Sequence, residues 1–271
     1  MKQALCTITS NVEIMPGICL MWIEAPEIAC SVQPGQFVTV RCGDFTLRRP
    51  FSVHQVSFPS FPSKGEDSRG GEIALLFKVA GKGTLWLSQR RTGDRIDILG
   101  PLGKGFSIEP GAKNLLLMAG GIGIAPLVFL MQNASSQHQV TLIHGASTAA
   151  QLYPFPPATG KKRSKLASLP SGVQFIPVTE DGSMGKKGMA TDILSDSLDW
   201  ADQVYACGPV DMYKAISPTA KKCQVSLELR MGCGFGACYG CTINTRKGLK
   251  QVCRDGPVFE LEDIIWQEVK I

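Results

Sequence analysis

The sequence predicts a chain of three parts: an N-terminal β-barrel, an α/β domain on a parallel sheet, and a small C-terminal cysteine-rich domain. Short segments rich in β-branched and apolar residues, separated by Gly and Pro, occupy roughly the first 110 residues. Apolar and helical segments then alternate, as in a parallel α/β sheet. Four of the ten cysteines lie between residues 233 and 253. We place the domains at residues 1–108, 109–224 and 225–271.

The composition is that of an ordinary globular protein and excludes several classes. Of the 271 residues, 44% are hydrophobic and 19% are charged, which argues against extended disorder. No apolar run reaches the ~20 residues of a membrane helix, and the N-terminus lacks the apolar core of a secretory signal. The net charge of +5 is mild and comes without a nucleic-acid reading motif. We therefore expect a cytoplasmic protein without a membrane span or a nucleic-acid partner.

Strands of the first domain are predicted at residues 38–42, 72–79 and 95–99. Each segment is rich in β-branched or apolar residues and is bounded by Gly or Pro. Residues 58–71 combine Pro, Ser, Gly and charged residues, so we expect a surface loop there. Short strands at this spacing are typical of a sandwich or a barrel.

The second domain opens with a continuous apolar run at residues 114–119, which is typical of a strand buried on both faces. A helix is predicted from Pro126 to Met131, because proline suits the first helical turn. Further strands are predicted at residues 140–144, 173–179 and 203–207. We interpret the Pro-rich residues 153–170, with a basic run at 161–165, as a solvated loop. Residues 259–266 predict a short helix or a partner-docking segment.

The clustered cysteines follow the pattern Cys-x4-Cys-x2-Cys-x11-Cys, formed by Cys233, Cys238, Cys241 and Cys253. A Cys-x4-Cys-x2-Cys run with a distant fourth cysteine is the plant-type [2Fe–2S] pattern. Glycines between the cysteines allow a tight loop that aims backbone N–H groups at sulfur. Residues 242–252 predict a hairpin that returns the fourth ligand. A zinc site and disulfides or inert buried thiols are the alternatives.

Two short motifs in the first domain suit a flavin. The first consists of Arg49, Pro50, Phe51 and Ser52. A guanidinium can pair with a pyrophosphate, an aromatic ring can lie on the isoalloxazine, and a hydroxyl can reach a ring nitrogen. Gly83 and Thr84 belong to a Gly-rich turn before a predicted helix, and such turns bind phosphate. A strand-end turn and a helix cap are the alternatives for each motif taken alone.

A nucleotide site is predicted where two strands of the second domain end. It consists of Gly120, Gly121, Gly123, Cys207, Gly208 and Pro209. A Gly-rich turn after a buried strand fits a dinucleotide pyrophosphate, although Pro126 stands where the Rossmann fingerprint has Gly or Ala. A buried structural role is the alternative for Cys207. No arginine follows Ser147 to hold a 2′-phosphate, which favours NAD over NADP without deciding between them.

Several of these motifs carry a resemblance to a known superfamily. The stretches at residues 34–37, 49–52, 81–84, 100–103, 120–126 and 207–209 resemble the ferredoxin–NADP reductase-like superfamily. Two stretches near the C-terminus narrow the resemblance to one family of this superfamily. They are Gly-Cys-Gly-Phe-Gly-Ala-Cys at 232–238 and Val-Cys-Arg-Asp-Gly-Pro-Val-Phe at 252–259. The chain resembles the electron-transfer subunits of NAD-linked, class 1B dihydroorotate dehydrogenases. The resemblance covers nearly the whole chain apart from residues 58–71 and 153–170.

The resemblance implies FAD, a [2Fe–2S] cluster and NAD as cofactors. Arg49, Pro50, Phe51 and Ser52 would hold FAD, Gly83 and Thr84 would bind its phosphates, and the next strand would line it with Leu76, Phe77 and Lys78. It further implies a catalytic partner subunit that contains FMN, in a heterotetramer of two copies of each. Electrons from dihydroorotate would pass through the cluster and FAD to NAD⁺, in de novo pyrimidine (UMP) biosynthesis.

Three other functions stay open at this point. One is a related electron-transfer subunit, such as that of a sulfide dehydrogenase or an NADH-dependent ferredoxin:NADP oxidoreductase. Some of those relatives replace one cysteine ligand with aspartate, whereas this chain has all four cysteines. Another is an oxygenase reductase, but residues 233–271 are too few for a ferredoxin domain of ~100 residues. A zinc-binding interaction module would show neither flavin nor iron–sulfur absorption.

Overall fold

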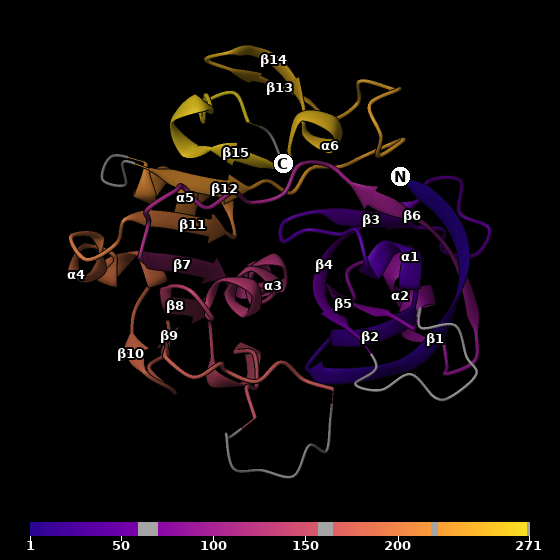
Figure 1. The fold of residues 1–271 in the computed structure, drawn as a ribbon, viewed down its shortest axis with the longest axis horizontal. Coiled ribbons are helices and arrows are strands. Elements are labelled where there is room, and N and C mark those ends of the chain that lie inside the picture. Colours follow the sequence, from indigo (N-terminus) through magenta and orange to yellow (C-terminus); the bar gives the residue numbers. More distant parts are fainter. Residues whose placement is uncertain (59–69, 157–164, 218–221, 270–271) are drawn as a thin grey trace.

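The computed structural model describes residues 1–58, 70–156, 165–217 and 222–269. Most of the predicted loop at 58–71 and the basic run at 161–164 therefore lie outside the described residues. The prediction of a solvated loop over residues 153–170 is wrong for its described ends, because Tyr153 and Ala167 are buried in the core. Figure 1 shows the barrel on the right, the parallel sheet on the left, and the C-terminal segment across the top of both.

Six antiparallel strands close the N-terminal barrel, as the sequence predicts. Their order is β1 (Lys2–Met15), β2 (Ile18–Glu24), β5 (Glu72–Lys78), β4 (Arg49–Ser57), β3 (Phe37–Val40) and β6 (Arg95–Leu102). Two short helices, α1 (Pro26–Ala29) and α2 (Lys82–Ser88), accompany them. Val38 and Val40 pack in the barrel interior, while Phe37 joins the core on the C-terminal side. The alternation of the strand thus gives the barrel wall two apolar faces.

The flavin motif lies within a strand, not at a turn after one. Arg49, Phe51 and Ser52 belong to β4, which pairs with β3 and β5. The strand-end turn, which is the alternative for this motif, is therefore not what the structure contains. The motif pairs with β3 along its whole length, whereas the pairing of β4 with β5 begins only at Val53. A site built on a paired strand is held more precisely than one on a free loop.

The second domain is a seven-stranded sheet in the order β10-β9-β8-β7-β11-β12-β15. Its parallel strands are β7 (Asn114–Gly120), β8 (Gln139–Ala146), β9 (Val173–Thr179), β10 (Lys186–Lys187), β11 (Gln203–Cys207) and β12 (Cys223–Ser226). The helices are α3 (Ile124–Ala134), α4 (Ser195–Leu198) and α5 (Val210–Ile216), with 3-10 turns at Gly121–Gly123, Ala149–Gln151 and Ala190–Ile193. The predicted alternation of strands and helices is confirmed.

The C-terminal segment is built onto this sheet. The predicted hairpin is present as β13 (Thr242–Thr245) and β14 (Gly248–Gln251), followed by α6 (Val252–Asp255). The prediction of a short helix over residues 259–266 is wrong for its first part. Phe259 lies in β15 (Val258–Glu260), which pairs antiparallel with β12, and only Leu261–Asp263 forms a 3-10 turn. Trp266 is buried and stacks on Tyr213, so this segment belongs to the core.

The predicted boundary between residues 224 and 225 falls inside β12. The predicted cysteine-rich domain thus contributes the second half of β12 and all of β15 to the sheet, and it shares a hydrophobic core with the α/β domain. We keep the division into residues 1–108, 109–224 and 225–271 as a proposal about sequence segments. None of the helices in the described ranges is long and apolar enough to cross a membrane.

Helix α3 joins the barrel to the sheet. Every residue from Ile124 to Met131 is buried, which is what a helix covered on all sides requires. Most of its apolar residues pack with Leu115 and Leu117 of β7 and with Trp22 of the barrel, whereas Phe129 reaches the barrel interior. The helix thus fixes where β7 ends relative to the flavin motif.

Two fully buried histidines lie where the barrel meets this domain. His54 of β4 places Nδ1 2.9 Å from the carbonyl oxygen of Ala125. His144 of β8 places Nε2 3.0 Å from the carbonyl oxygen of Gly121. Burial lowers the pKa of each histidine from 6.5 to about 4, so both are neutral near pH 7.

We predict that the folded protein loses stability as the pH falls from about 7 to 5. The unfolded chain protonates these histidines near pH 6.5, whereas the folded pKa is about 4, so protons favour unfolding in that window. Each histidine then costs about 2 kcal/mol at pH 5. Urea unfolding at the two pH values measures the loss, which should be smaller in His54→Gln. An equal loss in variant and wild type would contradict the prediction.

Candidate functional site

The predicted nucleotide residues meet where the strand order of the sheet reverses. From β7 the chain adds β8 and β9 on one side, then returns to add β11 and β12 on the other. Gly120 ends β7 and Cys207 ends β11, and these strands are parallel neighbours. Ligands of open α/β sheets bind outside the carboxyl ends of the strands at such a reversal. The geometry therefore places a binding edge at these residues.

The glycines of this edge have different roles. A Cβ on Gly123 would lie 2.0 Å from the carbonyl oxygen of Cys207, and one on Gly120 would lie 2.7 Å from Cδ of Pro209. These two glycines let the turns after β7 and β11 touch through their backbones. Gly121 has a φ of +52° and no atom within 4 Å of its would-be Cβ. Of the three glycines, only Gly121 has free space beside it.

Cys207 is buried next to the hydrogen-bonded hydroxyl of Tyr213. The Gly208 N–H donates to the Tyr213 hydroxyl at 2.9 Å, and that hydroxyl donates to the Ser226 carbonyl at 2.7 Å. Burial raises the pKa of Cys207 well above its usual range, so the side chain is a neutral thiol. A neutral, buried thiol fits a structural position at the end of β11.

A cavity of about 680 Å³ joins all three parts of the chain. Among its lining residues are Arg49, Pro50, Phe51, Ser52, Leu76, Phe77 and Lys78, all predicted for FAD. Phe51 and Phe77 lie side by side on adjacent strands with ring centroids 5.6 Å apart. Ile122 and Ala125 add the turn after β7 to the wall. The cavity therefore reaches from the barrel to the nucleotide edge.

Gly83 and Thr84 do not line this cavity. A Cβ on Gly83 would lie 2.9 Å from Nε of Arg49, so the glycine lets the arginine side chain pass close to α2. The Thr84 hydroxyl accepts the backbone N–H groups of Ala80 and Gly81 at 2.9 and 3.0 Å. Thr84 thus caps its own helix, and phosphate binding by these two residues stays a prediction.

Residues 227–231 form a wall of the cavity that sequence reasoning missed. They follow β12 directly and lead into the cysteine loop. Glu228 faces the open cavity, and the protein packed around it raises the pKa of its carboxyl group by desolvation. The signal available in the sequence was a carboxylate between two leucines, five residues before Cys233. That pattern has no strand or helix period, so periodicity did not reveal it.

The four clustered cysteines form two pairs. Backbone N–H groups connect the members of each pair: Cys233 N–H donates to Cys238 Sγ, and Cys253 N–H donates to Cys241 Sγ, both at 3.4 Å. Ala237 N–H also donates to Cys233 Sγ at 3.2 Å. Cys241 and Cys253 are buried in the core beneath, whereas Cys238 is exposed and Cys233 is partly exposed. The pairs thus lie at different depths.

The surroundings act differently on the two pairs. Burial raises the pKa of Cys253 to about 12, and the hydrogen-bonded neighbour Cys241 adds to the effect. Burial also acts to raise the pKa of Cys233, but donation by the backbone N–H groups of Phe235 and Cys238 outweighs it and lowers the pKa to about 6. N–H groups aimed at sulfur are the surroundings that a thiolate requires.

The two pairs fit a dinuclear cluster. Each iron of a [2Fe–2S] cluster takes two thiolates and two bridging sulfides, so four cysteines divide as two and two. In the described part of the chain, no three His, Cys, Asp or Glu side chains converge as they would around one ion. Below the loop, Thr39 packs its methyl group against Gly234, and its buried hydroxyl has no partner among the described residues. That hydroxyl is a further donor beside the cysteine loop.

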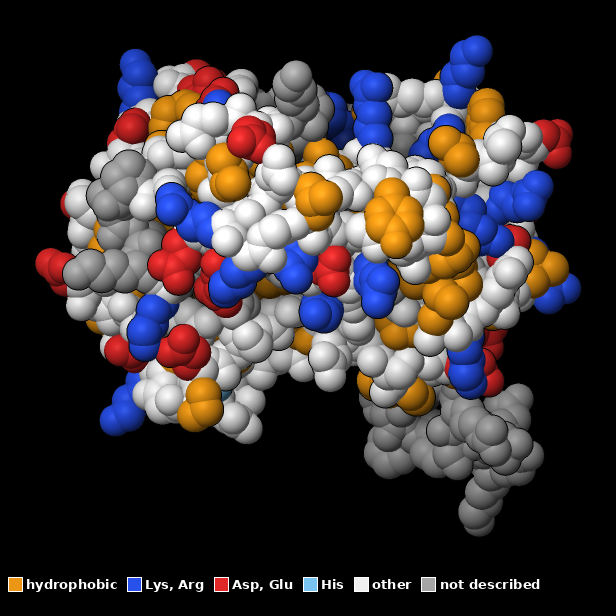
Figure 2. Space-filling view, turned by 90° about the horizontal axis from the view of Figure 1, so that it is seen from above, with side chains coloured by type: hydrophobic (Ala, Val, Ile, Leu, Met, Phe, Trp, Pro, Cys, Tyr) orange, Lys and Arg blue, Asp and Glu red, His pale blue; other side chains and the backbone are white. Residues whose placement is uncertain are grey.

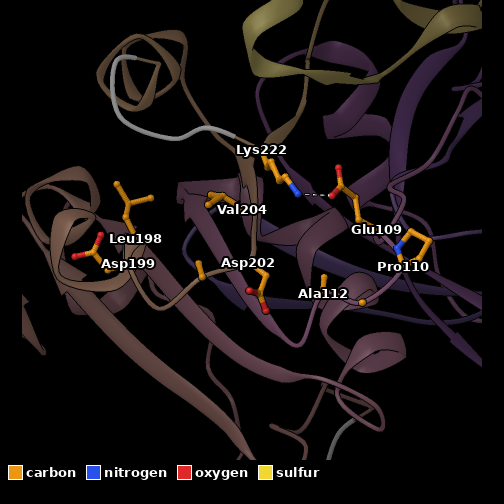
Figure 3. A pocket seen from close by; sticks show the side chains of 10 residues that line it. Glu109, Pro110, Ala112, Leu198, Asp199, Asp202, Val204 and Lys222 are labelled. Carbon is orange, nitrogen blue, oxygen red and sulfur yellow. Dashed lines mark hydrogen bonds and ion pairs between the residues drawn. The ribbon is translucent and has the colours of Figure 1, made fainter.

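A different cavity, of about 640 Å³, lies at the opposite edge of the sheet (Figure 3). It is lined by residues that precede β7, β11 and β12, at the amino ends of these strands. Lys222 and Glu109 pair across it at 2.8 Å, and Asp202 accepts the backbone N–H groups of Lys113 and Asn114. Lys222 and Glu109 thus neutralise each other, Asp202 is bound to backbone groups, and the cavity contains none of the predicted site residues.

Two family models match the chain. Residues 117–218 match the oxidoreductase NAD-binding domain, and residues 228–265 match the iron–sulfur cluster binding domain of dihydroorotate dehydrogenase B. Among solved structures, that of an NADH-dependent reduced ferredoxin–NADP oxidoreductase is similar over 97% of this chain and 91% of its own, with a TM-score of 0.77 and 29% identity. A ferredoxin NADP⁺ reductase from Neisseria gonorrhoeae shares the fold over 79% of this chain and 89% of its own, at 19% identity and a TM-score of 0.60.

Full-length relatives decide the family. The dihydroorotate dehydrogenase B (NAD(+)) electron transfer subunit of Desulforamulus reducens is 40% identical, over 94% of this chain and 95% of its own. The subunit of the same name from Bacillus velezensis is 34% identical, over 97% and 99%. With this identity along nearly the whole of both chains, the protein belongs to the family of dihydroorotate dehydrogenase B electron transfer subunits.

Proposed function

We propose that this chain carries electrons from the FMN of a dihydroorotate-oxidising subunit, through a [2Fe–2S] cluster and FAD, to NAD⁺ in UMP biosynthesis. The observation that carries the proposal is the 680 Å³ cavity, whose wall combines the barrel, the turn after β7 and residues 227–231. A flavin exchanges electrons singly or in pairs, whereas a nicotinamide takes hydride and a cluster takes one electron. The cavity lies where such a converter is needed.

FAD would occupy this cavity against β4 and β5. Phe51 and Phe77 offer an apolar surface for the ring, and Ser52 offers a hydroxyl at its edge. Arg49 is partly exposed, and its Nη1 donates to the Leu47 carbonyl at 2.6 Å. The guanidinium has further N–H groups that could pair with a pyrophosphate. The remaining wall residues in this assignment are Pro50, Leu76 and Lys78. Gly83 and Thr84, which lie outside the cavity on α2, would bind the phosphates next to Arg49.

NAD would bind at the carboxyl edge of the sheet, next to the same cavity. Gly121 has open space for a phosphate, while Gly120 and Gly123 keep the turn against Gly208 and Pro209. Ile122 and Ala125 lie between this edge and the flavin cavity. A nicotinamide held beside Cys207 would therefore face the isoalloxazine.

The cluster would be held by Cys233, Cys238, Cys241 and Cys253. Residues 227–231 connect the cysteine loop to the cavity by one short stretch of chain. Cys241 and Cys253 share a core with Phe37, which also lines the cavity. This arrangement holds the cluster side rigidly against the flavin side.

The catalytic partner would dock on the face that carries the cysteine loop. Figure 2 views the molecule from this side, and hydrophobic side chains gather on part of that surface. Phe235, Tyr239 and Leu249 of the C-terminal segment are 46%, 68% and 70% exposed. Exposed aromatic side chains of this kind are typical anchors of protein interfaces. We propose a cytoplasmic heterotetramer with two copies of each subunit.

A second function is favoured by one observation. The structural similarity to an NADH-dependent reduced ferredoxin–NADP oxidoreductase spans nearly the whole chain. The proposal of a dihydroorotate-linked subunit takes precedence, because the full-length relatives with higher identity carry that name. The two functions differ in the electron donor that the chain accepts.

Reconstitution with the catalytic subunit tests the proposal. The chain should co-purify with that subunit and contain about one flavin and two irons per copy, as one FAD and one [2Fe–2S] cluster require. The complex should reduce NAD⁺ with dihydroorotate, and neither subunit alone should do so. A loaded complex that reduces NAD⁺ with reduced ferredoxin and not with dihydroorotate would reject the proposal and support the second function.

We predict that Cys238→Ser removes the cluster and interrupts electron transfer from the partner. A serine is a poor replacement for a thiolate ligand, so iron content and dihydroorotate-dependent NAD⁺ reduction should both fall at least tenfold. NADH oxidation by an acceptor that takes electrons from the flavin should stay near the wild-type rate. The control is Cys30→Ser, an exposed cysteine on the barrel that should change nothing. Full iron and full activity in Cys238→Ser would refute the ligand assignment.

We predict that Arg49→Ala weakens FAD binding. Loss of a charge-assisted hydrogen bond to a phosphate costs about 1.5–3 kcal/mol, which corresponds to about 10–150-fold in the dissociation constant. Fluorescence titration of the apoprotein with FAD measures the change. Arg91→Ala removes an exposed arginine of the barrel and should retain wild-type affinity. Equal affinities of the two variants would place the pyrophosphate elsewhere.

A further inference from the structure

Tyr153 is fully buried just beyond β8, between the barrel and the α/β domain. Its hydroxyl lies 3.2 Å from Nε2 of His54 and accepts the Ala167 N–H at 3.0 Å. A carbonyl oxygen can only accept, so Nδ1 of His54 donates to Ala125. Nε2 of the neutral ring therefore lacks a proton and accepts the proton of the Tyr153 hydroxyl. Tyr153 thus holds the Ala125 carbonyl through His54.

The backbone of the same residue starts a second chain of hydrogen bonds. The Tyr153 N–H donates to Nδ1 of His144 at 3.3 Å. Nδ1 of this neutral ring is the acceptor, so Nε2 carries the proton and donates to the Gly121 carbonyl at 3.0 Å. Tyr153 therefore holds both ends of the turn from Gly121 to Ala125, one through its side chain and one through its backbone.

This turn forms the wall between the two proposed cofactor sites. Ile122 and Ala125 line the flavin cavity, and Gly121 offers its free side to the nucleotide edge. His54 comes from β4, two residues after Ser52 on the opposite wall of the cavity. The hydrogen bonds of Tyr153 therefore connect the flavin wall on the barrel to the turn in the α/β domain.

We propose that Tyr153 is a positioning residue for hydride transfer. Through His54 and His144 it fixes the turn from Gly121 to Ala125, so that a bound dinucleotide meets the flavin in one orientation. The inference rests on the proposed function, because it assumes FAD in the cavity and NAD at the carboxyl edge. It concerns the exchange between NADH and FAD, and the cluster side is independent of it.

The substitution Tyr153→Phe isolates this role. The ring of Tyr153 packs on His54 and Phe155, with centroids 5.2 and 4.7 Å apart, and phenylalanine keeps that packing. The change removes the donor to His54 and the acceptor for Ala167, which leaves two buried polar groups without partners. His54 then keeps its bond to the Ala125 carbonyl, but Tyr153 no longer orients its ring, so this end of the turn is held less firmly.

The matched control is Tyr205→Phe. Tyr205 is also fully buried, and its hydroxyl donates to the Ser107 carbonyl at 3.0 Å, away from the turn. Both variants lose one buried tyrosine hydroxyl, so they share any general effect of that loss. A difference between them reports on the turn.

The experiment measures flavin reduction in the complex with the catalytic subunit, by stopped flow, from each side. Tyr153→Phe should lower kcat/KM for NADH about tenfold, while flavin content and reduction by dihydroorotate stay at the wild-type level. Tyr205→Phe should match the wild type in both directions. Equal kinetics in the two variants, or equal losses from both electron donors, would overturn the inference. Failure of the proposed function is distinct, because the wild type itself would then not couple NADH to dihydroorotate.

A second variant covers the case in which Tyr153→Phe loses its flavin. His144→Asn keeps the Tyr153 hydroxyl and its bond to His54, but it removes the donor to the Gly121 carbonyl. A tenfold loss with NADH alone, at wild-type flavin content, supports the inference. Wild-type NADH kinetics in His144→Asn would overturn it.

Discussion

The backbone contact between the turns after β7 and β11 is the constraint on which the site depends. It exists because position 123 has no side chain: a Cβ there would lie 2.0 Å from the Cys207 carbonyl oxygen. No rotamer change relieves a clash between a Cβ and a backbone atom, so only glycine is compatible with this packing. The contact brings two strand ends together at the reversal of the sheet and directs α3 toward the barrel.

The position of the flavin motif relative to the nucleotide edge depends on the direction of α3. Its first turn places Ala125 against His54 of β4, and its middle packs against both β7 and the barrel. The flavin motif of β4 and the nucleotide edge are therefore set at a fixed separation by one helix, which is buried on every side from Ile124 to Met131. A rigid connection suits hydride transfer, since a small misplacement of the reacting atoms costs a large factor in rate.

Much of this arrangement follows from local sequence, and the remainder depends on tertiary contacts. The strand at 203–207 matches β11 residue for residue, because a central parallel strand is continuously apolar. β1 has no such signal: most of its residues are exposed or partly exposed, and two irregularities interrupt its pairing with β2. Phe259 lies in a stretch of helical appearance but pairs with Val225 in the sheet, where burial overrides local preference.

The candidate site divides in the same way. Cysteine spacing and the motif around Arg49 carry their chemistry in adjacent residues, so they can be found in a sequence without knowledge of the fold. Glu228 and Thr39 cannot be found in this way. Glu228 reaches the cavity because β12 ends there. Thr39 lies below the cysteine loop because β3 directs it to the outer face of the barrel, where the loop covers it. Their relevance arises from where distant strands end.

The shared core explains why the cysteine-rich segment need not fold alone. β15 extends the sheet, Trp266 stacks on Tyr213 of α5, and Cys241 and Cys253 are buried with residues of both. The inner pair of cysteines is thus held by the same packing that supports the nucleotide edge, while the outer pair lies on an exposed loop. The packing of the core thus sets the distance between the inner cysteines and the flavin, while the exposed loop is accessible to a partner. That separation lets one small segment serve both the inner electron path and the outer surface.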